Sequence, residues 1–452
     1  MKYNRQYTPD KINSLRDKEI FVFGSNLAGQ HAGGAARVAA EKFGAVWDRG
    51  VGLQGQSYAI PTMHGGPGEI RPYVDGFIRY AGAHPELTFF VTRIGCGIAG
   101  FRVHDIAPLF RDALTMPNII LPRDFVEDID IDDTSDAVGW DAAAFIRKYD
   151  ALMREVKSGR RYASDEIRQL RAQEFINTVE IVNQGFYISP DGTHHYFSRI
   201  PQMMTGSEFV ERELPVNTEA PLSEPTIISV VNEDCLDVAA RLVDLGYKPA
   251  LLNMASRRNP GGGVTTGAGA QEETLFRRTY LFKSLFQYAP YAPKYDITPS
   301  LHQYPLDRNF GGIYTPDVTY FRCSEAEGYA LKDAPVNFSV VSVAGINRPD
   351  LTPDGKEIAP YLVPAVKNKM RTILRLGLKH RCDSLVLGAL GCGAFRNPPR
   401  HIARLFHEVI EETEFRNKFR GIAFAILDDH NSHREHNPEG NFKPFADEFA
   451  KR

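Results

Sequence analysis

The sequence predicts an α/β protein with two domains of unequal size. Short apolar runs alternate with amphipathic stretches twice along the chain, and an acidic stretch separates the two series. The 452 residues, 43% hydrophobic and 24% charged, have the composition of a folded globular chain. At roughly 150 residues per domain, this length allows two or three domains, each with its own hydrophobic core.

The first series fits a small α/β domain over residues 1–125. Its strands are predicted from short apolar runs, and its helices from apolar residues that recur three and four positions apart. The predicted strands are 19–23, 58–61, 87–94 and 118–122, and the predicted helices are 32–43, 71–83 and 106–114. This alternation indicates a parallel or mixed sheet.

A connector is expected over residues 126–160. Six of the ten residues from Glu127 to Asp136 are acidic, which favours a solvated linker over a core element. Residues 140–157 then fit a helix.

The second series fits a larger α/β domain over residues 161–452. The predicted strands are 226–231, 250–254, 338–343, 384–387 and 422–427, and the predicted helices are 165–182, 235–245, 274–285, 362–376 and 401–412. The repeated alternation again indicates a sheet flanked by helices.

Composition argues against several classes of partner. The chain has 53 basic and 56 acidic residues, a net charge of −3, which makes a weak electrostatic case for nucleic acid. Its apolar runs are far shorter than the ~20 residues of a membrane span, and its first residues lack the apolar core of a signal peptide. We expect no membrane association.

The five cysteines and the C-terminal histidines indicate neither disulfides nor a metal. The cysteines, which include no CxxC pair, suit a reducing, cytoplasmic setting; they are Cys96, Cys235, Cys323, Cys382 and Cys392. His430, His433 and His436 lie around a proline and fit a solvated loop better than a metal site. We expect no cofactor and no metal.

The segment from Asn253 to Glu273 is the densest in glycine. Five glycines fall within nine residues directly after a predicted strand, so that backbone amides can approach an anion closely. The pattern is neither G-x-G-x-x-G nor a P-loop, which disfavours nucleotide hydrolysis and a simple dinucleotide site. Glu272 and Glu273 follow. One interpretation is that these carboxylates take part in chemistry beside a phosphate-binding loop. The other is that they complement the positive end of a helix next to a mobile loop.

A second strand runs into a glycine-rich turn, Gly391-Cys392-Gly393-Ala394-Phe395, and then into a predicted helix whose start can receive a phosphate. Two such loops in one α/β domain are expected to flank one crevice at the carboxyl ends of the strands. The ligand implied is a diphosphate. Cys392 fits a small buried side chain better than a nucleophile, because no histidine is placed to activate it.

These motifs resemble a known family. Gly261-Gly262-Gly263, seven further residues and then Gln271-Glu272-Glu273 are similar to the signature of poly(ADP-ribose) glycohydrolases. Asn253-Met-Ala and Gly391-Cys-Gly-Ala-Phe resemble the compact microbial branch of that family. The similarity extends from about Arg161 to the end of the chain.

The resemblance implies a macrodomain fold, a three-layer mixed sheet flanked by helices that binds ADP-ribose. It implies that Glu273 is the catalytic acid and that Glu272 orients the ribose. It also implies a set of ligand-binding residues: Asn253, Gly261, Gly262, Gly263, Gln271, Gly391, Cys392, Gly393, Ala394 and Phe395. Within this set, the two glycine loops hold the diphosphate and Phe395 packs on the terminal ribose.

The N-terminal region contains related patterns. Gly95-Cys96-Gly97 follows a strand as Gly391-Cys-Gly does, and Asn26 is followed by Gly33, Gly34 and an alanine-rich helix. This order also resembles the general macrodomain pattern. We expect a smaller macro-like domain with a possible second site at Asn26, Gly33, Gly34, Gly95 and Gly97. Alternatively, these glycines only allow tight strand–helix packing. No Gln-Glu-Glu motif is present there, so binding is expected in place of the same hydrolysis.

Two classes of function follow. The first is a glycohydrolase that cleaves the ribose–ribose O-glycosidic bond of poly(ADP-ribose), or a related ADP-ribosyl linkage, with polymer or ADP-ribosylated protein as substrate. Cleavage requires a carboxylic acid that protonates the departing 2′-oxygen, a role for Glu273. The alternative is a reader of ADP-ribose, or a hydrolase of another ADP-ribosyl metabolite.

Overall fold

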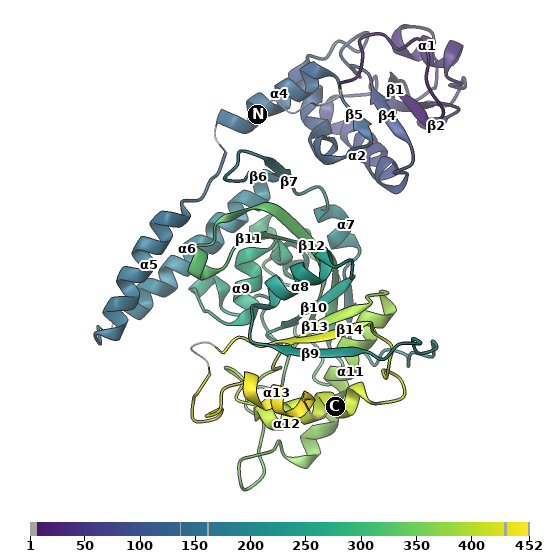
Figure 1. Cartoon of the computed structure of the whole chain (residues 1–452). Helices are drawn as coiled ribbons and strands as arrows, with labels where there is room; N and C mark the ends of the chain where they lie inside the picture. Colours follow the sequence, from purple (N-terminus) through teal and green to yellow (C-terminus); the bar gives the residue numbers. More distant parts are fainter. Residues whose placement is uncertain (1–6, 136, 161, 429–431, 451–452) are drawn as a thin grey trace. The chain divides into compact units, whose positions relative to one another are not determined.

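The computed structural model describes residues 7–135, 137–160, 162–428 and 432–450 (Figure 1). The chain forms two compact units. The smaller contains the residues up to Val138 with 185–187 and 194–198, and the larger contains 139–184, 188–193 and 199–452. The expected connector is therefore divided between the two units instead of standing apart.

The smaller unit is built on a five-stranded sheet of order β2-β3-β1-β4-β5. β1, β3, β4 and β5 are parallel, and only β2 runs antiparallel to its neighbour. The strands are β1 (Glu19–Ser25), β2 (Gly52–Gln54), β3 (Ser57–Pro61), β4 (Thr88–Val91) and β5 (Ile119–Ile120). The helices are α1 (Gly34–Lys42), α2 (Pro67–Ala83), α3 (Val103–Ile106), the 3₁₀ helix η1 (Ala107–Thr115) and α4 (Arg123–Ser135).

Helix α4 corrects the expectation of a solvated linker in the acidic stretch. Phe125, Val126 and Ile129 are buried in the core of the smaller unit, with 0%, 4% and 0% of their surface exposed. Apolar side chains three and four positions apart share one face of a helix, so few of them suffice to anchor it. Asp136, the last residue of the stretch, lies outside the described residues.

The larger unit is built on a seven-stranded mixed sheet of order β8-β11-β12-β10-β13-β14-β9. β12, β10, β13, β14 and β9 are parallel, and β8, β11 and β12 pair antiparallel. The strands are β8 (Glu208–Val210), β9 (Ile227–Val231), β10 (Pro249–Met254), β11 (Gly312–Arg322), β12 (Leu331–Val343), β13 (Ser384–Leu387) and β14 (Gly421–Ala425). A separate hairpin, β6 (Phe186–Ile188) with β7 (His194–Tyr196), has residues in each unit.

The helices of the larger unit pack on the seven-stranded sheet or on one another. They are α5 (Ala142–Lys157), α6 (Ala163–Gln184), α7 (Ile200–Thr205), α8 (Cys235–Asp244), α9 (Gln271–Arg278), α10 (Leu281–Phe286), α11 (Val363–Lys379), α12 (Pro399–Ile410) and α13 (Phe442–Phe449). Leu252 and Leu385 of the sheet share one buried core with Ile373 of α11 and Phe406 of α12. Because neighbouring residues of a strand face opposite sides, Asn253 points away from this core. No helix in the described part of the chain combines the length and apolar character that crossing a bilayer requires.

The predicted helix 274–285 is in fact two helices, and the first begins earlier, at Gln271. Thr279 breaks them with an extended backbone (φ −139°, ψ 172°) and forms a bridge with Tyr320. Its hydroxyl donates to the carbonyl of Leu275 at 2.7 Å. The earlier start matters, because it places Gln271, Glu272 and Glu273 in the first turn of α9.

Candidate active site

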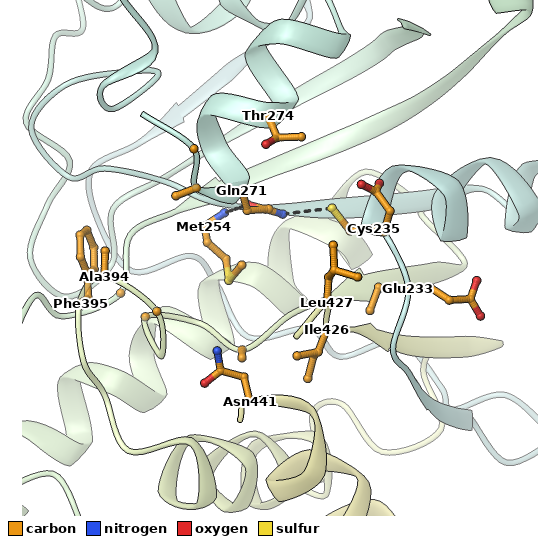
Figure 2. Close-up of a pocket in the computed structure, with 18 residues that line it drawn as sticks. Glu233, Cys235, Met254, Gln271, Thr274, Ala394, Phe395, Ile426, Leu427 and Asn441 are labelled. Carbon is orange, nitrogen blue, oxygen red and sulfur yellow. Dashed lines mark hydrogen bonds between the residues drawn. The ribbon is translucent and has the colours of Figure 1, made fainter. Parts of the chain in front are cut away.

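A cavity of about 210 Å³ opens at the carboxyl ends of the parallel strands of the larger unit (Figure 2). This is the edge where loops that follow neighbouring strands converge and where α/β sheets bind ligands. The residues that line it are Glu233, Asp234, Cys235, Met254, Gly269, Ala270, Gln271, Thr274, Gly345, Ala389, Gly391, Gly393, Ala394, Phe395, Ala425, Ile426, Leu427 and Asn441.

Gln271 fixes the start of helix α9 to strand β10. Its Oε1 accepts the N–H of Met254 at 2.8 Å, and its Nε2 donates to the carbonyl of Leu252 at 2.7 Å. Nε2 also lies 3.5 Å from Sγ of Cys235, as Figure 2 shows. The predicted ligand-binding residue Gln271 thus lines the cavity while its amide holds the helix in register with the sheet.

Glu273, the third residue of α9, bridges the glycine segment and the helix start. Its Oε1 accepts the N–H of Gly263 at 2.8 Å, and its Oε2 accepts the N–H of Ala270 at 3.0 Å. A carboxylate at this position satisfies helix-start amides and complements the positive end of the helix. Its position is therefore fixed by two backbone contacts.

Glu272 fixes the other half of the loop. Its Oε2 accepts the N–H of Ser256 at 2.7 Å, and its Oε1 accepts the N–H of Gly261 at 3.0 Å. Burial raises the pKa of Glu272 to about 8; these two N–H groups oppose the rise, and the charge of Glu273 adds to it. Glu272 therefore retains a proton near neutral pH.

The triple glycine lies directly against both carboxylates. A Cβ on Gly262, whose φ is +55°, would stand 2.4 Å from Oε1 of Glu273 and 3.2 Å from Oε2 of Glu272. A Cβ on Gly261, whose φ is +76°, would stand 2.6 Å from the ring of Phe276. Only glycine combines these backbone angles with so close an approach. The loop is thus packed tightly against the carboxyl pair.

Asn253 is fully buried behind the same loop. Its Nδ2 donates to Oγ of Ser342 at 3.0 Å on the neighbouring strand, while its Oδ1 has no partner within the described residues. An unpaired buried amide oxygen is costly unless a water or a ligand hydroxyl serves it. Because Asn253 is buried and is not among the residues that line the cavity, it lies behind the site.

The second glycine turn, from Gly391 to Phe395, forms another part of the cavity wall. Gly391 has φ +76°, and a Cβ there would stand 2.6 Å from Nδ2 of Asn397, which donates to the carbonyls of Gly391 (2.9 Å) and Ile346 (2.7 Å). Cys392 is fully buried, and burial raises the pKa of its thiol. It points away from the cavity and remains a thiol, unsuited to nucleophilic attack.

Two buried arginines at the carboxyl-terminal end of α9 fix the helix through hydrogen bonds. Arg278 donates from Nη1 to Oδ2 of Asp234 at 2.6 Å and from Nη2 to the hydroxyl of Tyr320 at 2.8 Å. Arg277 donates from Nη1 to the carbonyl of Ala268 at 2.9 Å. Both ends of α9 are therefore fixed, which keeps its first turn in place beside the cavity.

The structure brings the predicted residues together in two layers. Those that line the cavity are Gln271, Gly391, Gly393, Ala394 and Phe395, and those directly behind it are Asn253, Gly261, Gly262, Gly263, Glu272 and Glu273. Figure 2 shows Phe395 and Glu233 at opposite ends of the cavity. The triple glycine and the glutamate pair thus lie beside the cavity instead of in its wall.

Sequence reasoning missed part of the lining. Glu233, Asp234 and Cys235 follow the predicted strand at 226–231, and Ile426 and Leu427 end the predicted strand at 422–427. The carboxyl ends of parallel strands share one edge, so this signal was available. Asn441, from the segment before α13, had no signal in the sequence.

Two further predictions concern sites elsewhere. The five residues predicted for a second site, Asn26, Gly33, Gly34, Gly95 and Gly97, all line a separate cavity of about 320 Å³ in the smaller unit. Of the C-terminal histidines, His430 lies outside the described residues, and Nε2 of His436 lies 3.1 Å from the carbonyl oxygen of Cys392.

Comparison with known proteins shows what the larger unit is similar to. Residues 176–323 match the family described as microbial-type PARG, catalytic domain, where PARG is poly(ADP-ribose) glycohydrolase. No curated protein sequence matches this chain. A crystal structure of poly(ADP-ribose) glycohydrolase from Thermomonospora curvata is 27% identical, with 62% of this chain and 99% of that chain covered and a TM-score of 0.51.

A second solved structure belongs to the same family. It is poly(ADP-ribose) glycohydrolase from Deinococcus radiodurans in complex with ADP-ribose, 28% identical, with 56% of this chain and 97% of that chain covered and a TM-score of 0.42. The matched family segment contains the triple glycine and Gln271-Glu272-Glu273 at the start of α9. Residues 176–323 thus match the microbial-type poly(ADP-ribose) glycohydrolase catalytic domain, and the larger unit, which contains most of these residues, is similar to a bacterial poly(ADP-ribose) glycohydrolase structure.

Proposed function

We propose that the larger unit hydrolyses the ribose–ribose O-glycosidic bond of poly(ADP-ribose) and releases ADP-ribose. The observation that supports this most is the carboxyl pair Glu272 and Glu273, held by four backbone N–H groups between a triple-glycine loop and a cavity at the carboxyl ends of the strands. A carboxylic acid beside an anion cradle is the equipment that glycoside cleavage requires.

In the proposed reaction, Glu273 gives a proton to the departing 2′-oxygen as the C1–O bond breaks. Positive charge then develops at C1 of the ribose, and the negative diphosphate held at the glycine loops stabilises it. The ionised Glu273 next takes a proton from water, whose oxygen forms the new bond to C1. The products are ADP-ribose and a polymer shortened by one unit, and no second carboxylate is needed as a nucleophile.

Position distinguishes the two carboxyls. Glu273 accepts the N–H of Ala270, which lines the cavity, whereas Glu272 accepts the N–H groups of Ser256 and Gly261, which are not among the lining residues. This placement favours Glu273 as the group that gives the proton. Burial raises the pKa of Glu272 to about 8, so Glu272 stays protonated near neutral pH.

Polymer is favoured as the substrate by the charge next to Phe395. The N–H of Arg348 donates to the carbonyl of Phe395 at 2.8 Å, and Arg396 follows Phe395 directly. Both side chains are exposed and neither forms an ion pair within the described residues. Each further ADP-ribose unit of a polymer adds two negative charges, which exposed arginines attract over several ångströms.

The alternatives are a non-catalytic reader of ADP-ribose and a hydrolase of another ADP-ribosyl metabolite. A reader needs no buried acid at the scissile oxygen, whereas the Gln271-Glu272-Glu273 turn is intact here. We also propose a cytoplasmic location, which is supported by all five cysteines being free thiols.

Glu273→Gln tests the assignment. This variant is expected to bind ADP-ribose in calorimetry but to release none from labelled poly(ADP-ribose) or from mono-modified protein, because an amide cannot supply the proton. Glu224→Gln, at an exposed carboxylate, is the matched control and should keep full activity. Thermal unfolding of both variants separates lost chemistry from lost folding. Full turnover by Glu273→Gln would overturn the mechanism, and full activity on the modified protein alone would replace polymer as the substrate.

A further inference from the structure

The sheet of the smaller unit repeats the central part of the larger sheet. Its order, β2-β3-β1-β4-β5, corresponds to β11-β12-β10-β13-β14, and the strands follow in the same sequence along the chain. The directions also agree: in each set of five strands the first pair is antiparallel and the others are parallel. β1 therefore corresponds to β10, and β4 corresponds to β13.

The glycine turn after β4 has the same hydrogen bonds as the turn after β13. In the smaller unit, Ile94 donates to Thr92 (2.7 Å), Cys96 to Arg93 (3.2 Å), Gly100 to Gly97 (3.0 Å) and Phe101 to Gly95 (3.1 Å). In the larger unit, Leu390 donates to Gly388 (2.9 Å), Cys392 to Ala389 (3.0 Å), Arg396 to Gly393 (3.0 Å) and Asn397 to Gly391 (3.0 Å). Gly95 and Gly391 both have φ +76°. The two turns share one backbone conformation.

The cavity beside each turn is lined by corresponding residues. Gly95, Gly97, Ile98 and Ala99 line the 320 Å³ cavity, as Gly391, Gly393, Ala394 and Phe395 line the site of the larger unit. The strand pairing gives two further correspondences. Gly24 of β1 has the position of Met254 in β10, and Thr62, after β3, has the position of Gly345, after β12. All four residues line their cavities. The smaller cavity is thus placed in its sheet as the larger one is.

The starts of helices α1 and α9 differ in their chemistry. The first helical hydrogen bond runs from Arg37 to Gly33 in α1 and from Thr274 to Ala270 in α9. Counted from these bonds, Ala35 and Ala36 occupy the positions of Glu272 and Glu273. The first turn of α1 has no acidic residue, and its N-cap glycine has no side chain that could accept its N–H groups. These amides are open to an anion.

The charge of the smaller cavity also suits an anion. Its lining contains no carboxylate, and its one ionisable side chain is Arg93, whose Nε lies 2.9 Å from Oδ2 of Asp124. Asn26 holds the loop before α1 in place: its Oδ1 accepts the N–H of Gln30 (3.0 Å), and its Nδ2 donates to the carbonyl of Gln30 (2.9 Å). Ile98 stands exposed at the cavity, with 71% of its surface accessible.

We propose that the smaller unit binds the diphosphate group of a nucleotide, of the class of ADP-ribose, without cleaving it. The repeated turn and the uncapped start of α1 supply backbone N–H groups to the diphosphate. Ala36 occupies the position of Glu273, so this position offers no carboxylic acid that could protonate a glycosidic oxygen. The choice of ADP-ribose as ligand rests on the function proposed for the larger unit, whereas the anion site rests on the geometry of the smaller unit alone.

The test counts binding sites in the full chain by titration calorimetry with ADP-ribose. The Glu273→Gln form is the parent chain in these titrations. Two sites per chain are expected, and one site after the further substitution Ile98→Glu, which places a carboxylate beside the turn. Ala35→Glu is a second, independent block, because its carboxylate complements the helix start while it occupies the anion position. Arg79→Gln, an exposed substitution on α2 that changes the charge by the same single unit, should keep two sites.

The outcomes separate this proposal from that for the larger unit. One site in the parent chain and none after Ile98→Glu would support the smaller site and contradict ADP-ribose binding by the larger unit. One site in the parent, in Ile98→Glu and in Ala35→Glu would overturn the proposal made here. Parallel titrations with inorganic diphosphate show what the site recognises. If inorganic diphosphate binds at the same site, the site recognises the bare anion. If it does not, the site recognises the nucleotide. In the background with an intact Glu273, hydrolysis by Ile98→Glu should equal that of the parent.

Discussion

Gly262→Ala tests whether the triple glycine is required because its backbone lies against the carboxyls of Glu272 and Glu273. The added Cβ would stand 2.4 Å from Oε1 of Glu273, and Cβ atoms essentially never approach another atom closer than 3.0 Å. Either the loop or the carboxylate must then move by at least 0.6 Å. The contact at risk is the 2.8 Å hydrogen bond from the N–H of Gly263 to the same oxygen.

The expected cost has two parts. Alanine at φ +55° costs about 1–2 kcal/mol in the left-handed region. Losing a hydrogen bond to a charged group costs about 1.5–3 kcal/mol more. The free energy of unfolding should therefore fall by roughly 2.5–5 kcal/mol. Because catalytic groups must be held within a fraction of an ångström, we expect kcat to fall by about two orders of magnitude.

Gly246→Ala provides the matched control. Gly246 also has a left-handed backbone (φ +78°), but a Cβ there would meet nothing within 4 Å. This variant should lose only the conformational part, about 1–2 kcal/mol, and keep its activity. Urea unfolding measures the first quantity and release of ADP-ribose from labelled polymer measures the second. Equal unfolding free energies and equal activities in the two variants would refute the contact argument.

Two further predictions concern charge. The folded pKa of Glu272, about 8, lies above its ordinary value of 4.5, so its contribution to stability is complete below about pH 4.5 and is lost as pH rises through 8. Urea unfolding between pH 5 and 8 should show a loss of roughly 1.4 kcal/mol per pH unit from this group, and a flatter slope in Glu272→Gln; equal slopes would contradict the assignment. Arg396→Gln should raise KM for long polymer about fivefold at low salt with kcat unchanged, since one exposed charge contact is worth roughly 1 kcal/mol. Lys356→Gln is the control, and a KM insensitive to both salt and Arg396→Gln would exclude a role for this charge in polymer binding.

The sequence marked the glycine turns more clearly than it marked the boundaries of the elements. Glycine runs that follow strands require unusual backbone angles, so Gly261 to Gly263 and Gly391 to Gly393 stand out without a structure. Helix α4 was not expected, because the acidic composition concealed the buried Val126 and Ile129 of the expected connector. Strand β11 was not predicted either, because Pro316 and Asp317 interrupt it; the structure passes them with a bulge between Thr315 and Val318.

The sequence by itself determined the α/β alternation, the two glycine turns of the larger unit and the carboxyl pair that begins α9. These features are local, since they depend on residue type and spacing within one segment. Only the tertiary structure decided that Gly262 rests on both carboxylates, that Cys235 and Leu427 join the site, and that Ala35 and Ala36 take the places of Glu272 and Glu273 in the smaller unit. The physical reason is that these relations join segments far apart in the chain, which parallel strand pairing brings to one edge of each sheet.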